Sequence, residues 1–133
     1  MQSGMTHSLT VTVEPTMTAA NMKSGCLDVF ATPILIAFME NVCLECVQGA
    51  LDEGMTTVGT AVSVTHLAPT PVGMKVRFEC TLREIDRRRL TFDVRAFDEV
   101  SLIGEGTHER FVVDAQKFVQ KCRARGASGG REG

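Results

Sequence analysis

The chain has 133 residues and a formal net charge of −2, with 44% hydrophobic and 23% charged residues. This length fits a single globular domain that buries a core of its own. The slightly acidic balance excludes non-specific nucleic-acid binding, which requires a basic face. Five cysteines without a disulfide-type spacing, and an N-terminus without the basic and apolar regions of a signal peptide, predict a reduced cytoplasmic protein.

The first third of the chain predicts one strand followed by one long helix. Residues Ser8–Glu14 alternate apolar and polar side chains, which is the period of a half-buried strand. Residues 15–31 contain Pro, Gly and scattered polar residues, and they predict a loop with one short helical turn. The helix is predicted over Thr32–Leu51, with Thr32 as N-cap and Pro33 in the first helical position.

This predicted helix is the longest apolar run in the chain, yet it carries a carboxylate at its centre. Four polar side chains within the run favour a buried soluble helix over a membrane span: Glu40, Asn41, Glu45 and Gln48. A carboxylate in such a helix is costly unless it is paired or functional. We therefore expect Glu40 to be buried and to take part in the chemistry.

Four strands are predicted after the helix, because the apolar period changes from helical to alternating. They cover Thr56–Leu67, Met74–Ile85, Arg89–Phe97 and Ser101–Asp114. Their short connections predict an antiparallel meander. With one long helix packed on one face, the fold class is α+β, in the layout of the hotdog fold: a curved antiparallel sheet of about five strands wrapped around one central helix.

The C-terminal part is predicted to add little to this domain. About one further helical turn is expected after residue 115, and the run GASGGREG is typical of a disordered segment. The sequence thus predicts a single domain over residues 1–120 and a disordered tail over residues 121–133.

Three polar residues supply a hydroxyl, a carboxylate and an imidazole: Thr32 at the helix start, Glu40 within the helix, and His66 at the end of the next strand. This set of groups is suited to acyl transfer or hydrolysis. Without further context, Thr32 is equally a helix cap and His66 a structural histidine at a strand end.

Short segments along nearly the whole domain resemble the fluoroacetyl-CoA thioesterase type of hotdog thioesterases. They are VFAT at 29–32, ME at 39–40, GTA at 59–61, VTH at 64–66 and GTHER at 106–110. The resemblance implies a hydrolase of small acyl-CoA thioesters that acts as a homodimer, with coenzyme A as part of the substrate and without a metal or another cofactor. It implies catalytic roles for Thr32, Glu40 and His66, and an acyl pocket lined by Gly59 and Arg110.

The chain departs from this family in the loop before Thr32. The fluoroacetyl-specific enzyme has two phenylalanines there, three residues apart, which form a lid over the acyl group. This chain has Lys23 and Cys26 at the matching positions. The resemblance therefore does not extend to fluoroacetyl-CoA as the substrate.

Helix geometry predicts that two chains share each site. Thr32 and Glu40 are eight residues apart, which is about 12 Å along a helix axis. Short side chains do not meet across this distance, so the two groups would reach one thioester from opposite subunits. We expect a homodimer, and the sequence leaves open whether two dimers pair into a tetramer.

Other interpretations stay open at this stage. A hotdog dehydratase or hydratase would use the His and the carboxylate without Thr32, and a non-catalytic module would only bind acyl-CoA. The motif Cys43-x-x-Cys46 lies inside the predicted helix, where a redox pair is not expected and packing is favoured. The run Arg87-Arg88-Arg89 fits a solvated hairpin tip, or a contact for the phosphates of coenzyme A.

Overall fold

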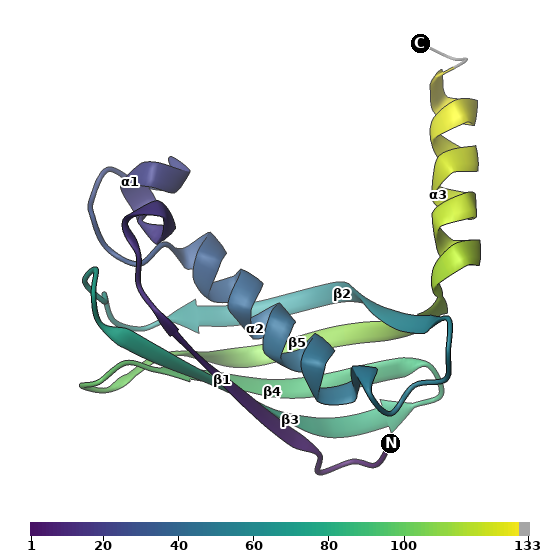
Figure 1. Cartoon of the computed structure of the whole chain (residues 1–133), viewed down its shortest axis with the longest axis horizontal. Coiled ribbons are helices and arrows are strands. Elements are labelled where there is room, and N and C mark those ends of the chain that lie inside the picture. Colours follow the sequence, from purple (N-terminus) through teal and green to yellow (C-terminus); the bar gives the residue numbers. More distant parts are fainter. Residues whose placement is uncertain (131–133) are drawn as a thin grey trace.

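A computed structural model of the chain describes residues 1–130. Five strands, three α-helices and one short 3-10 helix follow one another along these residues (Figure 1). In chain order they are β1 (Thr6–Thr12), η1 (Pro15–Met17), α1 (Ala19–Met22), α2 (Thr32–Gln48), β2 (Met55–His66), β3 (Lys75–Asp86), β4 (Arg89–Phe97), β5 (Leu102–Asp114) and α3 (Ala115–Gly130). The predicted long helix, the short turn before it and the strands are all present.

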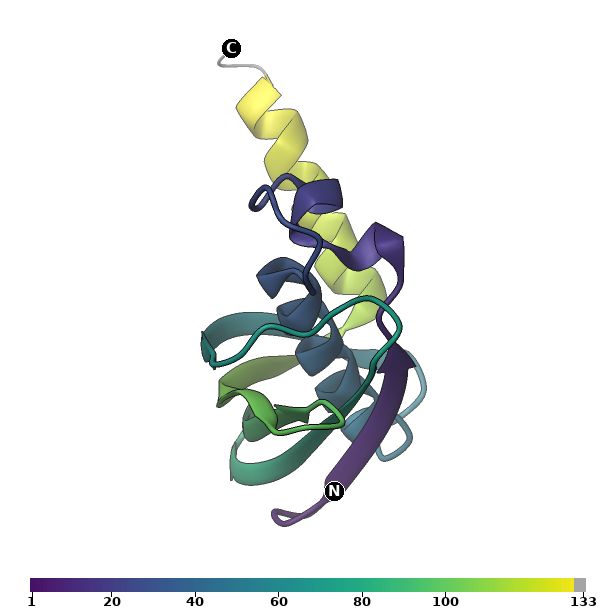
Figure 2. The same ribbon diagram turned by 90° about the vertical axis from the view of Figure 1, so that its left-hand side faces the viewer.

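All five strands form one antiparallel sheet in the order β1-β3-β4-β5-β2. Helix α2 crosses one face of this sheet, as the two orthogonal views show (Figures 1 and 2). The predicted α+β arrangement, with a curved sheet around one long helix, is confirmed.

The predicted meander of four strands is wrong at its first connection. β2 pairs with β5 at one edge of the sheet, whereas β3 lies between β1 and β4. The connection over residues 67–74 contains Pro69 and Pro71 and crosses the end of the sheet, where the Phe30 N–H donates to the Thr70 carbonyl at 2.9 Å. A two-residue turn joins neighbouring strands, but a connection of this length reaches a distant one. The consequence is that β2 has one free edge.

The core lies between α2 and the inner face of the sheet. Its helix residues recur at intervals of three and four positions, and its strand residues at intervals of two, as an amphipathic helix and a half-buried sheet require. A Cβ on Gly104 would lie 3.0 Å from Leu35 Cδ2, so this glycine allows the helix to approach β5. The buried helix side chains are Leu35, Met39, Val42, Cys43 and Val47, and those of β3 and β4 are Val76, Phe78, Cys80, Leu82, Leu90, Phe92, Val94 and Ala96.

The start of α2 differs from the prediction by one residue. Ala31 occupies the N-cap position, Thr32 is the first helical residue, and no side chain caps the helix. The Ala31 carbonyl accepts from the Leu35 N–H at 3.0 Å, so the first helical bond begins one residue earlier than expected. The hydroxyl of Thr32 is therefore free for another partner.

The chain after Asp114 also differs from the prediction. In place of one turn and a tail, the structure continues as α3 up to Gly130, with the Lys117 N–H donating to Asp114 Oδ1 at 3.0 Å at its start. Residues 131–133, the end of the predicted tail, lie outside the described residues. None of the helices within residues 1–130 is long and apolar enough to cross a membrane.

Candidate active site

Thr32 and His66 form a hydrogen-bonded pair at one end of the molecule. The Thr32 Oγ1 and His66 Nδ1 atoms are 2.7 Å apart, and they come from the first residue of α2 and the last residue of β2. They border an open pocket of about 300 Å³. The other residues that line it come from α1, the segment before α2 and the segment after β2: Ala19, Ser24, Val29, Phe30, Leu67, Ala68 and Pro69. A hydroxyl bonded to an imidazole beside a pocket is the arrangement of an activated nucleophile.

Burial keeps the His66 imidazole neutral. Loss of solvent lowers the pKa of His66, and the nearby backbone of Ala68 opposes this effect only in part. His66 Nε2 is buried and has no hydrogen-bond partner within residues 1–130. In the neutral tautomer with its proton on Nε2, the His66 ring has an unprotonated Nδ1 that accepts from the Thr32 hydroxyl.

A second cluster forms near the middle of α2, around Glu40. Arg110 Nη1 lies 3.9 Å from Glu40 Oε2, which is an ion pair without a direct hydrogen bond. The guanidinium is fixed from its other side: Arg110 Nε donates to Thr57 Oγ1 at 2.7 Å, and Nη2 donates to the Thr57 carbonyl at 2.9 Å. Arg110 is 6% exposed, so its charge is held in place beneath the carboxylate. Burial lowers the pKa of Arg110, and the Glu40 carboxylate acts in the opposite direction.

Gly59 lies against this cluster because it has no side chain. A Cβ at this position would lie 3.0 Å from Glu40 Oε2 and 3.2 Å from His108 Cε1. The register of β2 against β5 shifts between Gly59 and Ala61, so a bulge at Thr60 follows directly. Gly59 therefore lies close to the Glu40 cluster and directly before a bulge, and both positions favour a residue without a side chain.

His108 is a site residue that the sequence did not identify. Its Nδ1–H donates to the Ala61 carbonyl at 2.8 Å, and its Nε2 accepts from Arg110 Nη1 at 3.1 Å. Burial lowers the pKa of His108, an effect that the Ala61 carbonyl opposes and the Arg110 charge reinforces. His108 is two residues from Arg110 on the same strand, so the two side chains point to the same face. The two-residue spacing of His108 and Arg110 within one predicted strand was the feature of the sequence that could have identified His108 as a neighbour of Arg110.

The two clusters do not meet within one chain. Glu40 is eight residues from Thr32 along α2, and Gly59 is seven residues from His66 along β2, which is about 23 Å for an extended strand. The expectation that Glu40 is buried is wrong, since its side chain is 42% exposed. The reason is that Glu40 lies at the side of α2 that faces the edge strand β2 and not the centre of the sheet.

The cysteines of α2 belong to the core. Cys43 is fully buried, and burial raises the pKa of Cys46 to about 12, which disfavours the reactive thiolate. No group of three or more potential metal ligands occurs within the described residues. The positions of these thiols are consistent with packing.

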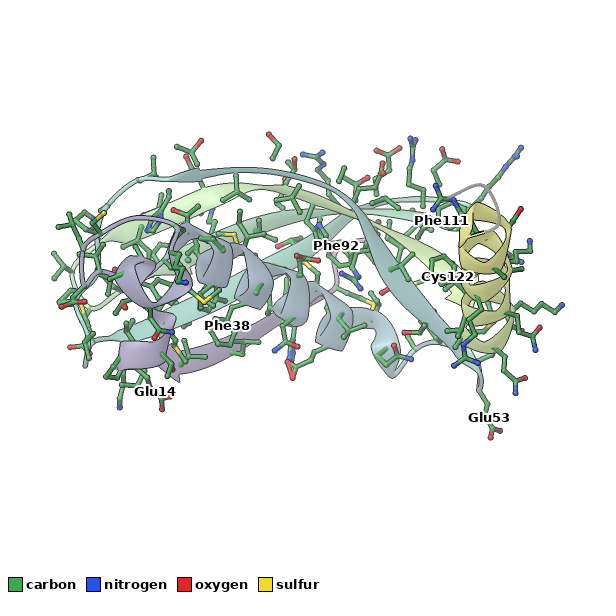
Figure 3. The ribbon with its side chains drawn as sticks, turned by 90° about the horizontal axis from the view of Figure 1, so that it is seen from above. Glu14, Phe38, Glu53, Phe92, Phe111 and Cys122 are labelled. Atoms are coloured by element: carbon green, nitrogen blue, oxygen red, sulfur yellow. The ribbon has the colours of Figure 1, made fainter. Side chains whose placement is uncertain are left out.

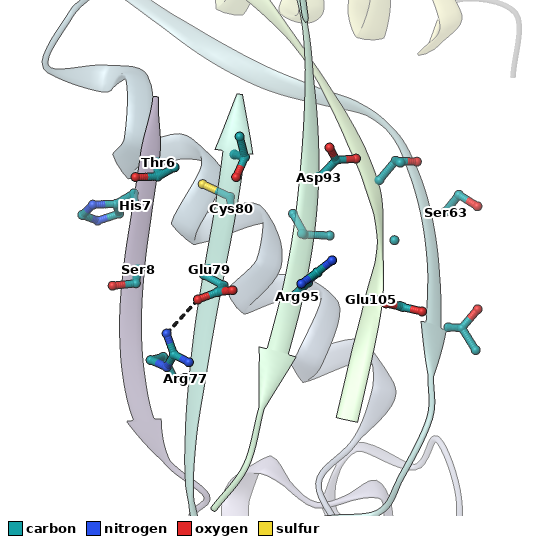
Figure 4. A pocket seen from close by; sticks show the side chains of 15 residues that line it. Thr6, His7, Ser8, Ser63, Arg77, Glu79, Cys80, Asp93, Arg95 and Glu105 are labelled. Carbon is teal, nitrogen blue, oxygen red and sulfur yellow. Dashed lines mark hydrogen bonds and ion pairs between the residues drawn. The ribbon is translucent and has the colours of Figure 1, made fainter. Parts of the chain in front are cut away.

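A larger hollow than the pocket at Thr32 and His66 lies on the outer face of the sheet (Figure 4). It measures about 1150 Å³ and has polar and charged walls, with an ion pair of 2.7 Å between Arg77 and Glu79. None of the five predicted site residues lines it. The predicted catalytic residues Thr32 and His66 line the smaller pocket of about 300 Å³ instead.

Comparison with known proteins identifies the relatives of this chain. The profile of the fluoroacetyl-CoA-specific thioesterase family matches residues 13–116. A fluoroacetyl-CoA thioesterase from Streptantibioticus cattleyicolor is 41% identical over 102 residues, which are 77% of this chain and 73% of that protein.

Solved structures of thioesterases are also similar to this chain. A crystal structure of the fluoroacetyl-CoA-specific thioesterase has a TM-score of 0.89 and 35% identity, and covers 93% of this chain and 96% of its own. A thioesterase superfamily member from Thermus thermophilus has a TM-score of 0.90 at 26% identity, covering 98% and 96%. A hot-dog-like protein from Thermanaerovibrio acidaminovorans, with a TM-score of 0.86 at 23% identity and coverage of 94% and 93%, shares the fold. The predicted hotdog fold is confirmed.

Proposed function

The chain belongs to the family of fluoroacetyl-CoA-specific thioesterases and is an acyl-CoA thioesterase, and we propose that it hydrolyses esters of small acyl groups in sites shared by two copies. The observation that carries the proposed mechanism is the 2.7 Å contact between the Thr32 hydroxyl and His66 Nδ1. It supports Thr32 as the nucleophile and His66 as its base.

In the first half of the reaction, His66 Nδ1 takes the hydroxyl proton as Thr32 Oγ1 attacks the thioester carbonyl carbon. The carbon–sulfur bond then breaks, and the coenzyme A thiolate leaves with the proton from His66. This produces an ester between Thr32 and the acyl group. The burial that lowers the pKa of His66 supports this role, because it favours the neutral imidazole, the form that can accept a proton.

In the second half, Glu40 activates the water that hydrolyses the Thr32 ester. The carboxylate takes a proton from the water as the water oxygen attacks the ester carbonyl carbon. The bond between this carbon and Thr32 Oγ1 then breaks, the proton passes from Glu40 to Thr32 Oγ1, and the free acid leaves. Arg110 holds the carboxylate from beneath, while 42% of the Glu40 side chain stays open to an incoming water or substrate. The backbone N–H of Gly59 is the proposed donor to the oxyanion.

The free edge of β2 supports the proposed homodimer. Residues 59–63 in the middle of this edge strand are all exposed, including Val62 at 39%. An unpaired edge is a template for another strand. If two copies pair antiparallel along β2, with the two-fold axis between Val62 and Ser63, Gly59 of one copy faces His66 of the other. Each pair of Thr32 and His66 then meets a Glu40 cluster from the second copy.

The proposed substrates have small acyl groups. The pocket of about 300 Å³ lies at the small end of the usual range for ligand sites. Lys23 caps α1 in a left-handed conformation and Cys26 is exposed, so neither residue forms an apolar lid. We therefore propose short unsubstituted acyl-CoA esters in place of fluoroacetyl-CoA. Location in the cytoplasm and pairing of dimers into a tetramer stay predictions.

The test is release of coenzyme A from a panel of acyl-CoA esters of increasing chain length. The wild-type protein should favour the short esters. Glu40→Gln should lower turnover by roughly 10² or more, as expected for loss of a general base. Thr32→Val removes the nucleophile with little change in shape and should be equally damaging.

Two outcomes would contradict the proposal. A Thr32→Val protein with nearly normal activity would exclude the acyl-threonine, and it would point to chemistry that needs only the carboxylate and the imidazole. A wild-type protein that is stabilised thermally by acyl-CoA but releases no coenzyme A would be a binding module.

A further inference from the structure

Positive charge is concentrated in the last helix. Residues 1–114 contain nine Lys and Arg against fifteen Asp and Glu, a balance of −6, whereas residues 115–133 contain five against one, a balance of +4. Coenzyme A carries a diphosphate and a 3′-phosphate, so a body with net negative charge repels the substrate of the proposed reaction. The C-terminal segment has the opposite sign.

Four of the nine Lys and Arg residues before α3 pair with carboxylates, one of them Arg110 of the proposed site. Arg77 pairs with Glu79 at 2.7 Å, Arg83 with Asp93 at 2.9 Å, and Arg89 with Asp86 at 3.0 Å. In contrast, Lys117, Lys121, Arg123 and Arg125 of α3 form no ion pair with any residue in the range 1–130. These four charges are available to a ligand.

Helix α3 also has an apolar stripe without a partner. Ala115, Phe118, Val119 and Cys122 recur at helical spacing, and Phe118 and Val119 are 44% and 45% exposed. Lys117, Lys121 and Arg125 recur every four residues and form a basic row beside this stripe. A helix of this kind is suited to lie on another surface while its cations stay accessible.

The position of α3 connects it to the proposed site. The helix begins after Asp114, four residues beyond Arg110 on β5, which is about 14 Å along the strand. The Arg88 carbonyl accepts from the Val112 N–H at 2.8 Å, so the tip of the β3–β4 hairpin lies at the same end. Asp52 and Glu53 lie at the same end of the molecule as the start of α3. The Gly54 carbonyl accepts from the Ala115 N–H at 3.0 Å, and Figure 3 shows Glu53 beside α3. Asp86 and Asp114 lie at this end as well, but Asp86 pairs with Arg89 and Asp114 accepts from the Lys117 N–H. Lys117, Lys121 and Arg88 form no ion pair within residues 1–130.

The direction of α3 is toward the second copy. Figures 1 and 2 show that α3 rises beyond the β2 edge of the sheet, and that α1 lies on the same side at the other end of the molecule. Antiparallel pairing along β2 would bring α1 and the pocket of Thr32 and His66 of one copy to the α3 end of the other. The basic row would then lie beside the entrance of that pocket.

We propose that α3, through Lys117 and Lys121 with support from Arg88, binds the phosphates of the coenzyme A whose thioester occupies the pocket of the second copy. This inference rests on the proposed function and adds the part of the substrate that the catalytic residues do not contact. The pantetheine arm of coenzyme A is an extended chain, which separates the thioester from the phosphates by a distance comparable to that between Arg110 and α3.

The experiment compares two esters of the same acyl group, one of coenzyme A and one of N-acetylcysteamine, which lacks the nucleotide and all phosphates. In the double variant Lys117→Gln and Lys121→Gln, KM for the coenzyme A ester should rise roughly tenfold or more, while kcat/KM for the N-acetylcysteamine ester stays unchanged. The matched control is Arg77→Gln with Arg95→Gln, which removes two charges from the outer face of the sheet. The control should leave both esters unaffected.

Binding measured by calorimetry with free coenzyme A and with pantetheine separates this inference from the proposed function. The wild type should bind coenzyme A more tightly than pantetheine, and the α3 double variant should lose most of that difference. If the double variant and the control behave alike, or if both esters are affected equally, α3 is not the phosphate site. A wild type that hydrolyses neither ester would overturn the proposed function, and the calorimetry would still decide whether α3 binds the phosphates.

Discussion

Gly59 shows how a single missing side chain shapes the proposed site. A Cβ there would approach Glu40 Oε2 to 3.0 Å, closer than nearly all real contacts of this kind, while Arg110 Nη1 would be 3.5 Å away. The carboxylate would have to move away from β2, the strand along which the second copy is proposed to lie. The position of Glu40 is thus set by β2 as well as by its own helix.

Gly59→Ala should therefore lower kcat by roughly tenfold while the protein stays folded, because the Glu40 carboxylate has to move by a few tenths of an ångström, less than the shift of about 1 Å that costs about 10². Gly49→Ala is the matched control, since nothing lies within 4 Å of a Cβ at that position and its backbone is helical. Steady-state hydrolysis of a short acyl-CoA ester by both variants is the measurement. Equal activity of the two would show that Glu40 does not need the space at Gly59.

His108 should make the stability of the protein sensitive to acid. Burial lowers the pKa of His108 below its ordinary value near 6.5, so protonation is more costly in the folded chain than in the unfolded one. Its contribution is fully present above pH 6.5 and is lost as the pH falls below this value toward the lower folded-state pKa.

His108→Gln keeps a donor for Ala61 and an acceptor for Arg110 but cannot be protonated. The wild type should lose more free energy of unfolding than this variant when the pH falls from about 7.5 to about 5.5. Urea denaturation at the two pH values gives the comparison. Parallel losses in the two proteins would mean that His108 does not titrate with folding.

At the level of single residues, the sequence predicts which groups take part better than how they are arranged. Thr32 lies at the start of α2 as expected, but its hydroxyl bonds to His66 and not to the helix backbone. The burial of Glu40 was predicted from the apolar composition of the helix, which does not tell which side of α2 faces the edge of the sheet. The sequence favours a structural role for His108, because it does not reveal the contacts of this side chain with the Ala61 carbonyl and with Arg110.

Among the elements, β2 has the most direct functional consequence. It is the edge strand at which the proposed dimer forms: it pairs with β5 on one side, its other side is free, and its central residues are exposed. The alternating pattern predicted the strand itself to within a residue or so. Its place at the edge depends on the crossing connection at Pro69 and Pro71, which a strand pattern does not reveal.

Val62→Lys tests this edge. Charged side chains on an edge strand oppose pairing, and near a two-fold axis the two lysines would also repel each other. The variant should be monomeric by light scattering and at least roughly 10² less active. Val100→Lys is the control, because Val100 is 80% exposed in the turn before β5. A monomeric Val62→Lys protein with full activity would show that one chain contains a complete site.

Helix α3 was predicted least well. Its Gly and Ser content near the end suggested a tail, and the exposed apolar stripe and basic row became visible only once the segment was seen as a helix. The apolar residues at 115, 118, 119 and 122 have helical spacing, but the Gly and Ser residues that follow them are typical of a disordered segment and led to the prediction of a tail.

For the whole molecule, the fold follows from patterns within one chain, while the proposed function depends on two. The pair of Thr32 and His66 lies at one end of α2, and the cluster of Glu40, Gly59 and Arg110 lies farther along the helix. The sequence predicted this separation from the spacing of eight residues. The sequence did not show that β2 has a free edge. Pairing of two copies along this edge is the proposed way to bring the Thr32–His66 pair of one copy to the Glu40 cluster of the other.

The most direct test of the shared site is complementation between two inactive variants, Thr32→Ala and Glu40→Gln. After unfolding and refolding of an equal mixture, half of the dimers should contain one chain of each kind. In such a dimer one site has both intact residues and the other has neither, so the mixture should recover roughly a quarter of wild-type activity. A mixture that forms the mixed dimer by native mass spectrometry but is no more active than its parents would contradict the account.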